Sequence, residues 1–126
     1  MGEAAIGVIL FDAGPLIDLE RNKGRWLALL REARETNARL MTTEAVVAQV
    51  WAGPANANLS RVLKQFEIEP LFGDHEIIGP LSKSMSKPDV VDASLVYWAK
   101  RRDCKIATND HDDLAPLCAQ LGVTLA

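Results

Sequence analysis

The chain has 126 residues, a hydrophobic fraction of 48%, a charged fraction of 25% and a net charge of −3. This length suits a single domain over residues 1–126 that buries its own core. Two cysteines, Cys104 and Cys118, exclude a disulfide framework and lack the spacing of zinc ligands, so we interpret them as small hydrophobic residues. The acidic balance excludes a global basic field, but metal-binding carboxylates would bias that sum.

The N-terminal segment carries no targeting or membrane signal. It has neither a basic region nor a small-residue cleavage site, and its apolar run at 6–11 is too short to span a bilayer. We therefore expect a soluble, cytoplasmic protein with no membrane partner. The run itself, bounded by acid and glycine, predicts a strand buried on both faces. Pro15 suits the first position of a short apolar helix after Asp12.

The middle of the chain alternates between helical and extended patterns. Val46, Val47, Val50 and Trp51 would form the apolar stripe of a helix capped by Thr42 or Thr43. In chain order, the spacing predicts a helix over 24–36, a strand over 39–42, a helix from Thr43 to Gly53, a helix over 57–66, a strand over 67–71 and a helix over 74–85.

The last third continues this alternation. After a loop at 84–88, we expect a helix over 89–102 with Val90, Ala93, Leu95, Val96 and Ala99 inward, a strand over 104–108, a helix over 110–121 and a short strand over 123–125. Strands that alternate with helices throughout indicate an α/β fold with a parallel sheet covered on both faces.

Acidic residues recur where these strands end and helices begin. Asp12 and Asp110 follow the first and fourth strands, and Glu44 comes just after the second. Asp89 and Asp92 share the first turn of one helix, three residues apart. Since the carboxyl ends of parallel strands meet at one sheet edge, these groups converge if the first and fourth strands are neighbours. Converging carboxylates suit a divalent cation.

Each acid also has a structural interpretation. Asp89 suits a helix N-cap, with Asp92 as its capping-box partner. Glu44 would favour the positive end of a helix dipole, and Asp110 is a possible N-cap. Asp12 is harder to explain by structure alone, because a buried strand rarely ends in acid for packing reasons. The joint placement of the acids at one edge favours a metal site.

Four segments of the chain resemble the PIN-domain family, and within it the VapC-type toxins of bacterial toxin–antitoxin pairs. They are Ile9-Leu-Phe-Asp12-Ala-Gly-Pro-Leu-Ile17, Thr43-Glu44 with Val47 to Trp51, Asp89-Val-Val-Asp92-Ala-Ser-Leu-Val-Tyr-Trp-Ala99, and Ile106-Ala-Thr-Asn-Asp110-His-Asp-Asp-Leu114. The resemblance covers nearly the whole chain. The last two segments, at their mutual distance, are fairly specific, whereas the first is generic.

The resemblance implies a PIN-like three-layer α/β/α sandwich with a parallel sheet of about five strands. It also implies a Mg²⁺- or Mn²⁺-dependent endoribonuclease, the toxin of a toxin–antitoxin pair, with an RNA substrate, a cognate antitoxin and commonly a homodimer. By position, the acidic quartet is Asp12, Glu44, Asp92 and Asp110, with Asp89 and Asp113 as possible additions. The family usually has a small hydroxyl residue where Ala13 or Gly14 stands, and Thr43 and Thr108 are the hydroxyl candidates nearby.

For the mechanism, we expect Asp12, Asp92 and Asp110 to bind the metal, directly or through water. Glu44 is the best candidate to orient or deprotonate the attacking water. The cations that would contact RNA are grouped as Arg21, Lys23 and Arg25, as Lys83 and Lys87, and as the run Lys100-Arg101-Arg102.

Other polar and aromatic residues are assigned structural roles. His75 and His111 are expected at the surface, because a site of hard oxygen ligands does not need them. The three tryptophans and Tyr97 are expected to pack in the core or at interfaces. Trp51, before Ala52-Gly-Pro, is a candidate to hold an antitoxin helix or a second protomer.

Two rival functions remain. A haloacid-dehalogenase-like phosphatase needs a second Asp two positions after the first, where this chain has Gly14, and a suitably placed lysine is missing too, which also disfavours a receiver domain. The stronger alternative is a non-catalytic module of the same fold that only binds a partner protein. Such a module would be expected to have lost acids, and this chain keeps all four.

Overall fold

The computed structural model describes residues 7–22, 24–53, 57–70 and 75–126. In chain order, its elements are β1 (Val8–Phe11), α1 (Ala13–Glu20), α2 (Trp26–Glu35), β2 (Arg39–Thr43), α3 (Glu44–Ala52), α4 (Ala57–Leu63), β3 (Glu67–Glu69), α5 (His75–Ser84), α6 (Val90–Arg102), β4 (Lys105–Ala107) and α7 (His111–Leu121). Most lie within a segment predicted from the sequence; the exceptions are α1, which begins two residues before Pro15, and β2, which extends one residue beyond the predicted strand to Thr43. Ile6, Lys23, Pro54, Leu71 and Asp74, which belong to predicted features, lie outside the described residues.

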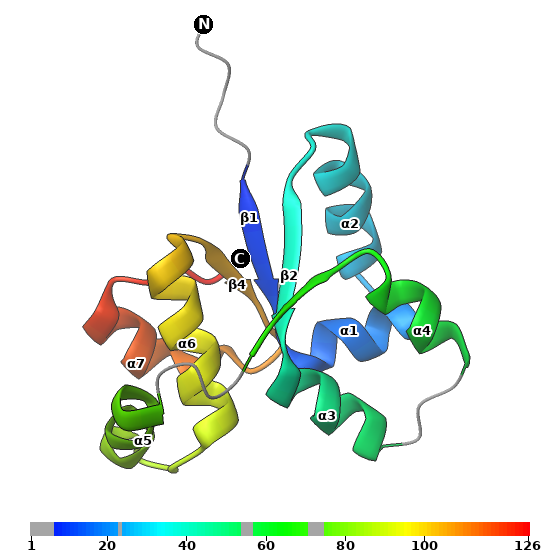
Figure 1. Cartoon of the computed structure of the whole chain (residues 1–126). Coiled ribbons are helices and arrows are strands. Elements are labelled where there is room, and N and C mark those ends of the chain that lie inside the picture. The colour runs from blue at the N-terminus through cyan, green and yellow to red at the C-terminus, as the bar shows by residue number, and fades with distance from the viewer. Residues whose placement is uncertain (1–6, 23, 54–56, 71–74) are drawn as a thin grey trace, which may run out of the picture.

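The strands form one parallel sheet in the order β3-β2-β1-β4 (Figure 1). From β1 the chain builds β2 and β3 outward on one side, then returns to add β4 on the other side of β1. Strand order therefore reverses between β1 and β4. Parallel sheets bind ligands outside the carboxyl ends of their strands at such a reversal. The first and fourth strands are neighbours, which is the condition for the acids to converge.

The sheet has four strands in the described residues, not about five. The segment expected as a last strand, 123–125, makes a single parallel bridge between Ile106 and Leu125. The Ile106 N–H donates to the carbonyl of Thr124 at 3.1 Å, and the Ala126 N–H donates to the Ile106 carbonyl at 2.8 Å. Because β4 has only three residues, the segment runs beside it too briefly to form a ladder.

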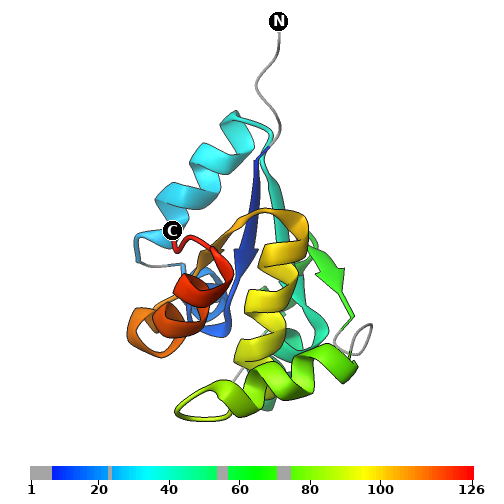
Figure 2. The ribbon, with the colours of Figure 1, turned by 90° about the vertical axis from the view of Figure 1, so that its left-hand side faces the viewer.

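Helices cover both faces of the sheet, as the sandwich architecture requires (Figures 1 and 2). Helices α1 to α4 lie on one side, where α1 packs against α2, α3 and α4. Helix α6 packs on β1 and β2 from the other side and is flanked by α5 and α7. None of the helices in the described ranges has the length and apolar content needed to cross a bilayer.

The core is built around the strand residue that precedes Asp12. The ring of Phe11 is fully buried and lies edge-on to Trp26 at 6.1 Å and to Phe66 at 5.0 Å. Across the sheet, Leu95 and Val96 of α6 are fully buried. Burying side chains of this size contributes roughly 1.5–3 kcal/mol each.

Two residues predicted to face inward are exposed instead. Val90 is 44% exposed because it is the first residue of α6, one turn before the fully buried residues Ala93 to Val96. Trp51 is 48% exposed and lies in the last turn of α3, where Val50 takes the inward position. The exposure of Trp51 agrees with the interface alternative rather than with a core role.

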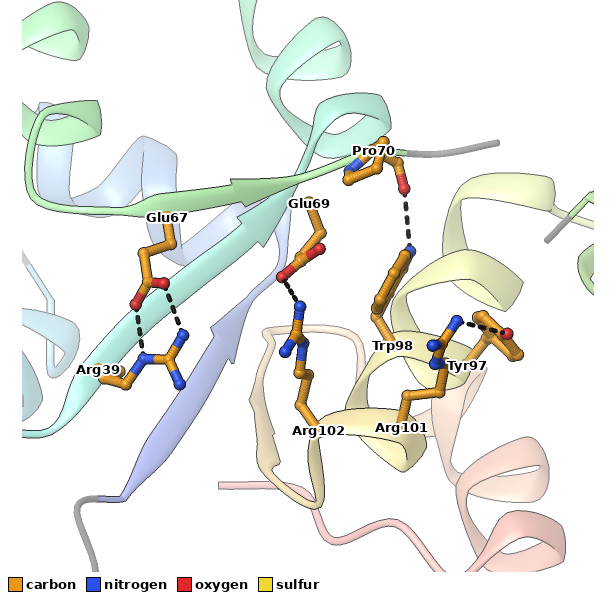
Figure 3. Close-up of polar contacts among 8 residues, drawn as sticks. All are labelled: Arg39, Glu67, Glu69, Pro70, Tyr97, Trp98, Arg101 and Arg102. Carbon is orange, nitrogen blue, oxygen red and sulfur yellow. Dashed lines mark hydrogen bonds and ion pairs between the residues drawn. The ribbon is translucent and has the colours of Figure 1, made fainter. Parts of the chain in front are cut away.

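The edge strand β3 is held by arginine side chains (Figure 3). Arg39 forms two hydrogen bonds with Glu67, from Nε to Oε2 at 2.7 Å and from Nη2 to Oε1 at 2.6 Å. Arg102, at the end of α6, pairs with Glu69. These four residues, here called the arginine-paired surface, match each carboxylate with a guanidinium.

Candidate metal centre

Asp12 is fixed at the carboxyl end of β1. Its side chain is 5% exposed, and Oδ1 accepts a hydrogen bond from the Ala13 N–H at 2.7 Å, which makes Asp12 the N-cap of α1. The helix therefore begins at Ala13, and Pro15 takes its third position rather than the predicted first. Burial raises the pKa of Asp12 above its ordinary value despite its two hydrogen bonds.

Thr108 links the ends of β1 and β4. It is fully buried, and its hydroxyl donates to Oδ2 of Asp12 at 2.8 Å while accepting from the Asp110 N–H at 3.0 Å. Asp110 lies at the N-cap position of α7, but its side chain makes no capping hydrogen bond and is exposed. Thr108 thus holds Asp12 and sets the backbone from which the Asp110 carboxylate projects.

Asp89 and Asp92 begin α6 on the other side of β1. Asp89 caps the helix, because its Oδ1 accepts from the Asp92 N–H at 3.0 Å. Burial, followed by the charges of Asp89, Asp12, Asp110 and Asp113, raises the pKa of Asp92 to about 7. Asp12, Asp89, Asp92 and Asp110, here called the acidic cluster, therefore lie close enough to act on one another electrostatically.

The acidic cluster is not a closed cage. Among the described residues, no three His, Cys, Asp or Glu side chains approach closely enough to hold one ion together. Nor does any basic side chain in those ranges pair with the acidic cluster. This donor set fits a Mg²⁺ or Mn²⁺ ion that is bound directly by one or two carboxylates and keeps several of its own waters, because Mg²⁺ seldom occupies all-protein cages.

A cavity of about 590 Å³ opens beside Asp89 and Asp92. The loop before α6 and residues along α7 form its walls, which include Lys87, Asp112 and Asp113. Both aspartates are exposed, as expected for groups outside the central quartet. Asp113 nevertheless contributes to the raised pKa of Asp92, so its charge reaches the acidic cluster.

Glu44 and Thr43 lie at the carboxyl end of β2. Thr43 is fully buried and caps α3 by accepting from the Val46 N–H at 3.2 Å, which confirms the predicted cap. Glu44 is the first residue of α3, exposed and outside the lining of the cavity. Its expected role with the attacking water stays a prediction.

Asn109 was missed by the sequence analysis. Its side chain accepts from the Trp26 indole N–H at 2.8 Å and donates to Oδ2 of Asp18 at 3.2 Å. A Cβ at Gly14 would lie 2.7 Å from its Nδ2, so a hydroxyl residue at that position would displace the amide. The position of Asn109 between Thr108 and Asp110 was the available signal, but its partners come from distant helices.

The remaining candidates lie at the surface or in the core. His75 and His111 are exposed, as predicted, and Trp26 and Trp98 are buried. The Trp98 indole donates to the carbonyl of Pro70 at 3.0 Å (Figure 3). Both cysteines are free, and burial raises each thiol pKa to about 11, in keeping with a packing role.

The fold is similar to that of several solved structures. No family model and no curated protein matches the sequence. A chain of VapBC2 from Rickettsia felis, solved with a DNA fragment from their promoter, has a TM-score of 0.73 and 13% identity over 94% of this chain and 97% of that one. PAE2754 from Pyrobaculum aerophilum has a TM-score of 0.58 and 19% identity over 96% and 98%. A chain of FitAB bound to the IR36 DNA fragment has a TM-score of 0.54 and 18% identity over 94% of this chain and 93% of that one. The PIN-like fold predicted from the sequence is thereby confirmed.

Proposed function

We propose that this chain is a Mg²⁺- or Mn²⁺-dependent endoribonuclease that serves as the toxin of a toxin–antitoxin pair. One observation carries the proposal. At the reversal point of the sheet, two partly or fully buried carboxylates, Asp12 and Asp92, have raised pKa values and no cationic partner in the described ranges. Such groups are costly to a fold and typical of functional sites. A divalent cation would offset their repulsion.

The proposed ligands of the cation are Asp12, Asp92 and Asp110, of which one or two would bind it directly and the rest through water. When bound, it would supply a more acidic water for attack on phosphorus and positive charge for the leaving oxygen. Thr108 keeps one oxygen of Asp12 oriented through its hydroxyl. Glu44 is proposed to orient the attacking water or to accept its proton.

The substrate is proposed to be RNA whose phosphates contact the cations around the cavity. Lys87 lines the cavity together with Asp89 and Asp92, and Lys83 is exposed at the end of α5, just before the cavity loop. A lysine beside bound metal would contact phosphate oxygens as a point charge. Cleavage should therefore weaken as salt is added.

The partner is proposed to be an antitoxin protein, and a second copy of the chain is a further candidate. VapBC2 and FitAB are both complexes bound to DNA fragments, and their chains share this fold. On this chain, Trp51 of α3 is 48% exposed, so its indole is accessible to an antitoxin helix or a second protomer.

The proposal is tested by metal binding and RNA cleavage measured together. Wild-type protein should bind Mn²⁺ in calorimetry and cleave single-stranded RNA, with no cleavage in EDTA. Asp12→Asn should lower cleavage at least roughly 100-fold, because it removes a ligand charge at the centre of the site. Glu67→Gln, which removes the same charge from the arginine-paired surface, is the matched control and should cleave normally.

The non-catalytic binding module remains the second candidate, because no three carboxylates in the described ranges lie close enough to share an ion. It predicts wild-type protein that neither binds Mn²⁺ nor cleaves RNA yet still binds its protein partner. An Asp12→Asn variant with wild-type cleavage would exclude the proposed site altogether.

A further inference from the structure

The turn between β4 and α7 carries Thr108 and Asp110 on either side of Asn109. Thr108 bonds to Asp12, and Asp110 projects its carboxylate from the start of α7. The side chain of Asn109 bonds to neither of them. It forms hydrogen bonds instead with Asp18 of α1 and Trp26 of α2, and so connects this turn to the opposite layer of the fold.

The chemistry of its two partners fixes the orientation of the Asn109 amide. The indole N–H of Trp26 can only donate, so it meets Oδ1 at 2.8 Å. The carboxylate of Asp18 accepts, so it meets Nδ2 at 3.2 Å. A side chain at position 109 must therefore present one acceptor and one donor in two set directions.

The Trp26 partner is itself held firmly. Its side chain is 2% exposed and lies edge-on to Phe11, the residue before Asp12. The guanidinium of Arg25 stacks over its ring at 4.2 Å from the centroid. Asn109 is thus anchored to a buried side chain of the core that also contacts the end of β1.

Gly14 leaves the space that the amide occupies. A Cβ at this position would lie 2.7 Å from Nδ2, 3.2 Å from Cγ and 3.3 Å from Cβ of Asn109. A methyl group there would push the amide away from α1. The hydrogen bonds of Asn109 therefore depend on the absence of a side chain at Gly14.

We propose that Asn109 is a positioning residue that fixes the turn carrying Thr108 and Asp110 against α1 and α2, and so sets the Asp110 carboxylate relative to Asp12 for a divalent cation. This inference rests on the proposed function. It assigns Asn109 no contact with the cation or with RNA. Residues that orient metal ligands in this way typically affect metal affinity by 10–100-fold.

The test compares four variants with wild type, using Mn²⁺ alone as the probe. Asn109→Ala removes both bonds, and Gly14→Ala displaces the amide while raising the helix propensity of α1. Gly79→Ala is the matched control, because a Cβ there meets nothing within 4 Å. The double variant Asn109→Asp with Asp18→Asn exchanges donor and acceptor, and it restores both bonds.

Three measurements are made on each variant: Mn²⁺ affinity by calorimetry, the metal-free Tm, and the ¹H–¹⁵N resonance of the Trp26 indole. Asn109→Ala and Gly14→Ala should each weaken Mn²⁺ binding by roughly 10-fold and shift the indole resonance. Gly14→Ala should do so without a fall in Tm, which a merely structural role does not predict. Gly79→Ala and the double variant should both keep Mn²⁺ affinity within about threefold of wild type.

The outcomes separate this inference from the proposed function. If wild type binds Mn²⁺ and both Asn109→Ala and Gly14→Ala bind it equally well, the positioning role is wrong and the nuclease proposal stands. If wild type binds no Mn²⁺, the nuclease proposal fails and the positioning role fails with it. Weakened binding in both variants, restored in the double variant, supports the role.

Discussion

The carboxylates of the acidic cluster and those of the arginine-paired surface lie in opposite electrostatic environments. On the arginine-paired surface, the hydrogen bonds from Arg39 lower the pKa of Glu67. In the acidic cluster, burial and neighbouring carboxylates raise the pKa of Asp92 to about 7. The arginine-paired surface holds an edge strand to the sheet, whereas the acidic cluster lies where the strand order reverses.

This difference identifies the acidic cluster as the part of the molecule that is incomplete by itself. The ionised form of Glu67 stabilises the folded state, because Arg39 pairs with its charge. Asp92 loses free energy when it ionises in the folded state, and no cation in the described ranges compensates for it. This electrostatic cost to stability is typical of functional sites and supports the proposed metal site.

The largest expected effect comes from neutralising Asp92. Asp92→Asn should lower RNA cleavage at least roughly 100-fold while raising metal-free stability at pH 8 by about 1 kcal/mol after solvent screening, since it removes like-charge repulsion. The measurements are a cleavage assay and urea denaturation. Glu67→Gln, the matched control, should cleave normally and be slightly less stable. A loss of stability in Asp92→Asn would contradict the destabilising effect assigned to the ionised Asp92 side chain.

Metal addition should give the next largest effect. A cation that binds only the folded state at 100 times its Kd stabilises by about 2.7 kcal/mol, which is roughly 10 °C in Tm for a chain of this size. Mn²⁺ should produce this rise in wild type at pH 8, measured by thermal denaturation. Asp110→Asn should show much less of it. An equal rise in both proteins would mean that the ion binds elsewhere.

The pH dependence of metal-free stability should also differ between the two regions. The folded pKa of Asp92, about 7, exceeds its ordinary value of 3.8, so the native state holds a proton that the unfolded state has released. Stability should therefore fall as pH rises from about 4 to 7 and level off above that. Denaturation across this range should give a shallower slope for Asp92→Asn than for wild type.

Glu67 should contribute with the opposite sign. Its pKa is lowered from 4.5, so its stabilisation is present above that value and is lost as the pH falls through its folded pKa. Denaturation below pH 5 should show a smaller loss for Glu67→Gln than for wild type. Equal acid sensitivity in the two proteins would contradict the role of Arg39.

The smallest effect is expected on the arginine-paired surface. Arg102→Ala removes the partner of Glu69 and the guanidinium that lies 5.6 Å from the Trp98 ring centroid. It should lower stability by about 1 kcal/mol and leave Mn²⁺ affinity unchanged. Calorimetry and urea denaturation on the same sample check both expectations. Weakened Mn²⁺ binding would link two regions that the comparison treats as independent.

The sequence predicted the strands and helices well because their apolar periodicity is local. The buried run before Asp12 and the helix after Asp89 needed no knowledge of the rest of the chain. Errors arose at helix ends, where Val90 and Trp51 proved exposed, since the packing partners of a first or last turn come from other elements. The expected fifth strand was reduced to one bridge because its neighbour β4 has only three residues.

The order of the elements and the presence of acids at strand and helix ends could be predicted from the sequence, because both follow from side-chain chemistry at fixed spacing. Which acids interact depends on how the elements pack. Placing β4 beside β1 brought Thr108 to Asp12, and packing α6 on β1 and β2 gave Asp92 its raised pKa. Asn109 gained its role from Trp26, 83 positions away in the chain. Desolvation and charge coupling depend on distances through space, which residue spacing along the chain does not contain.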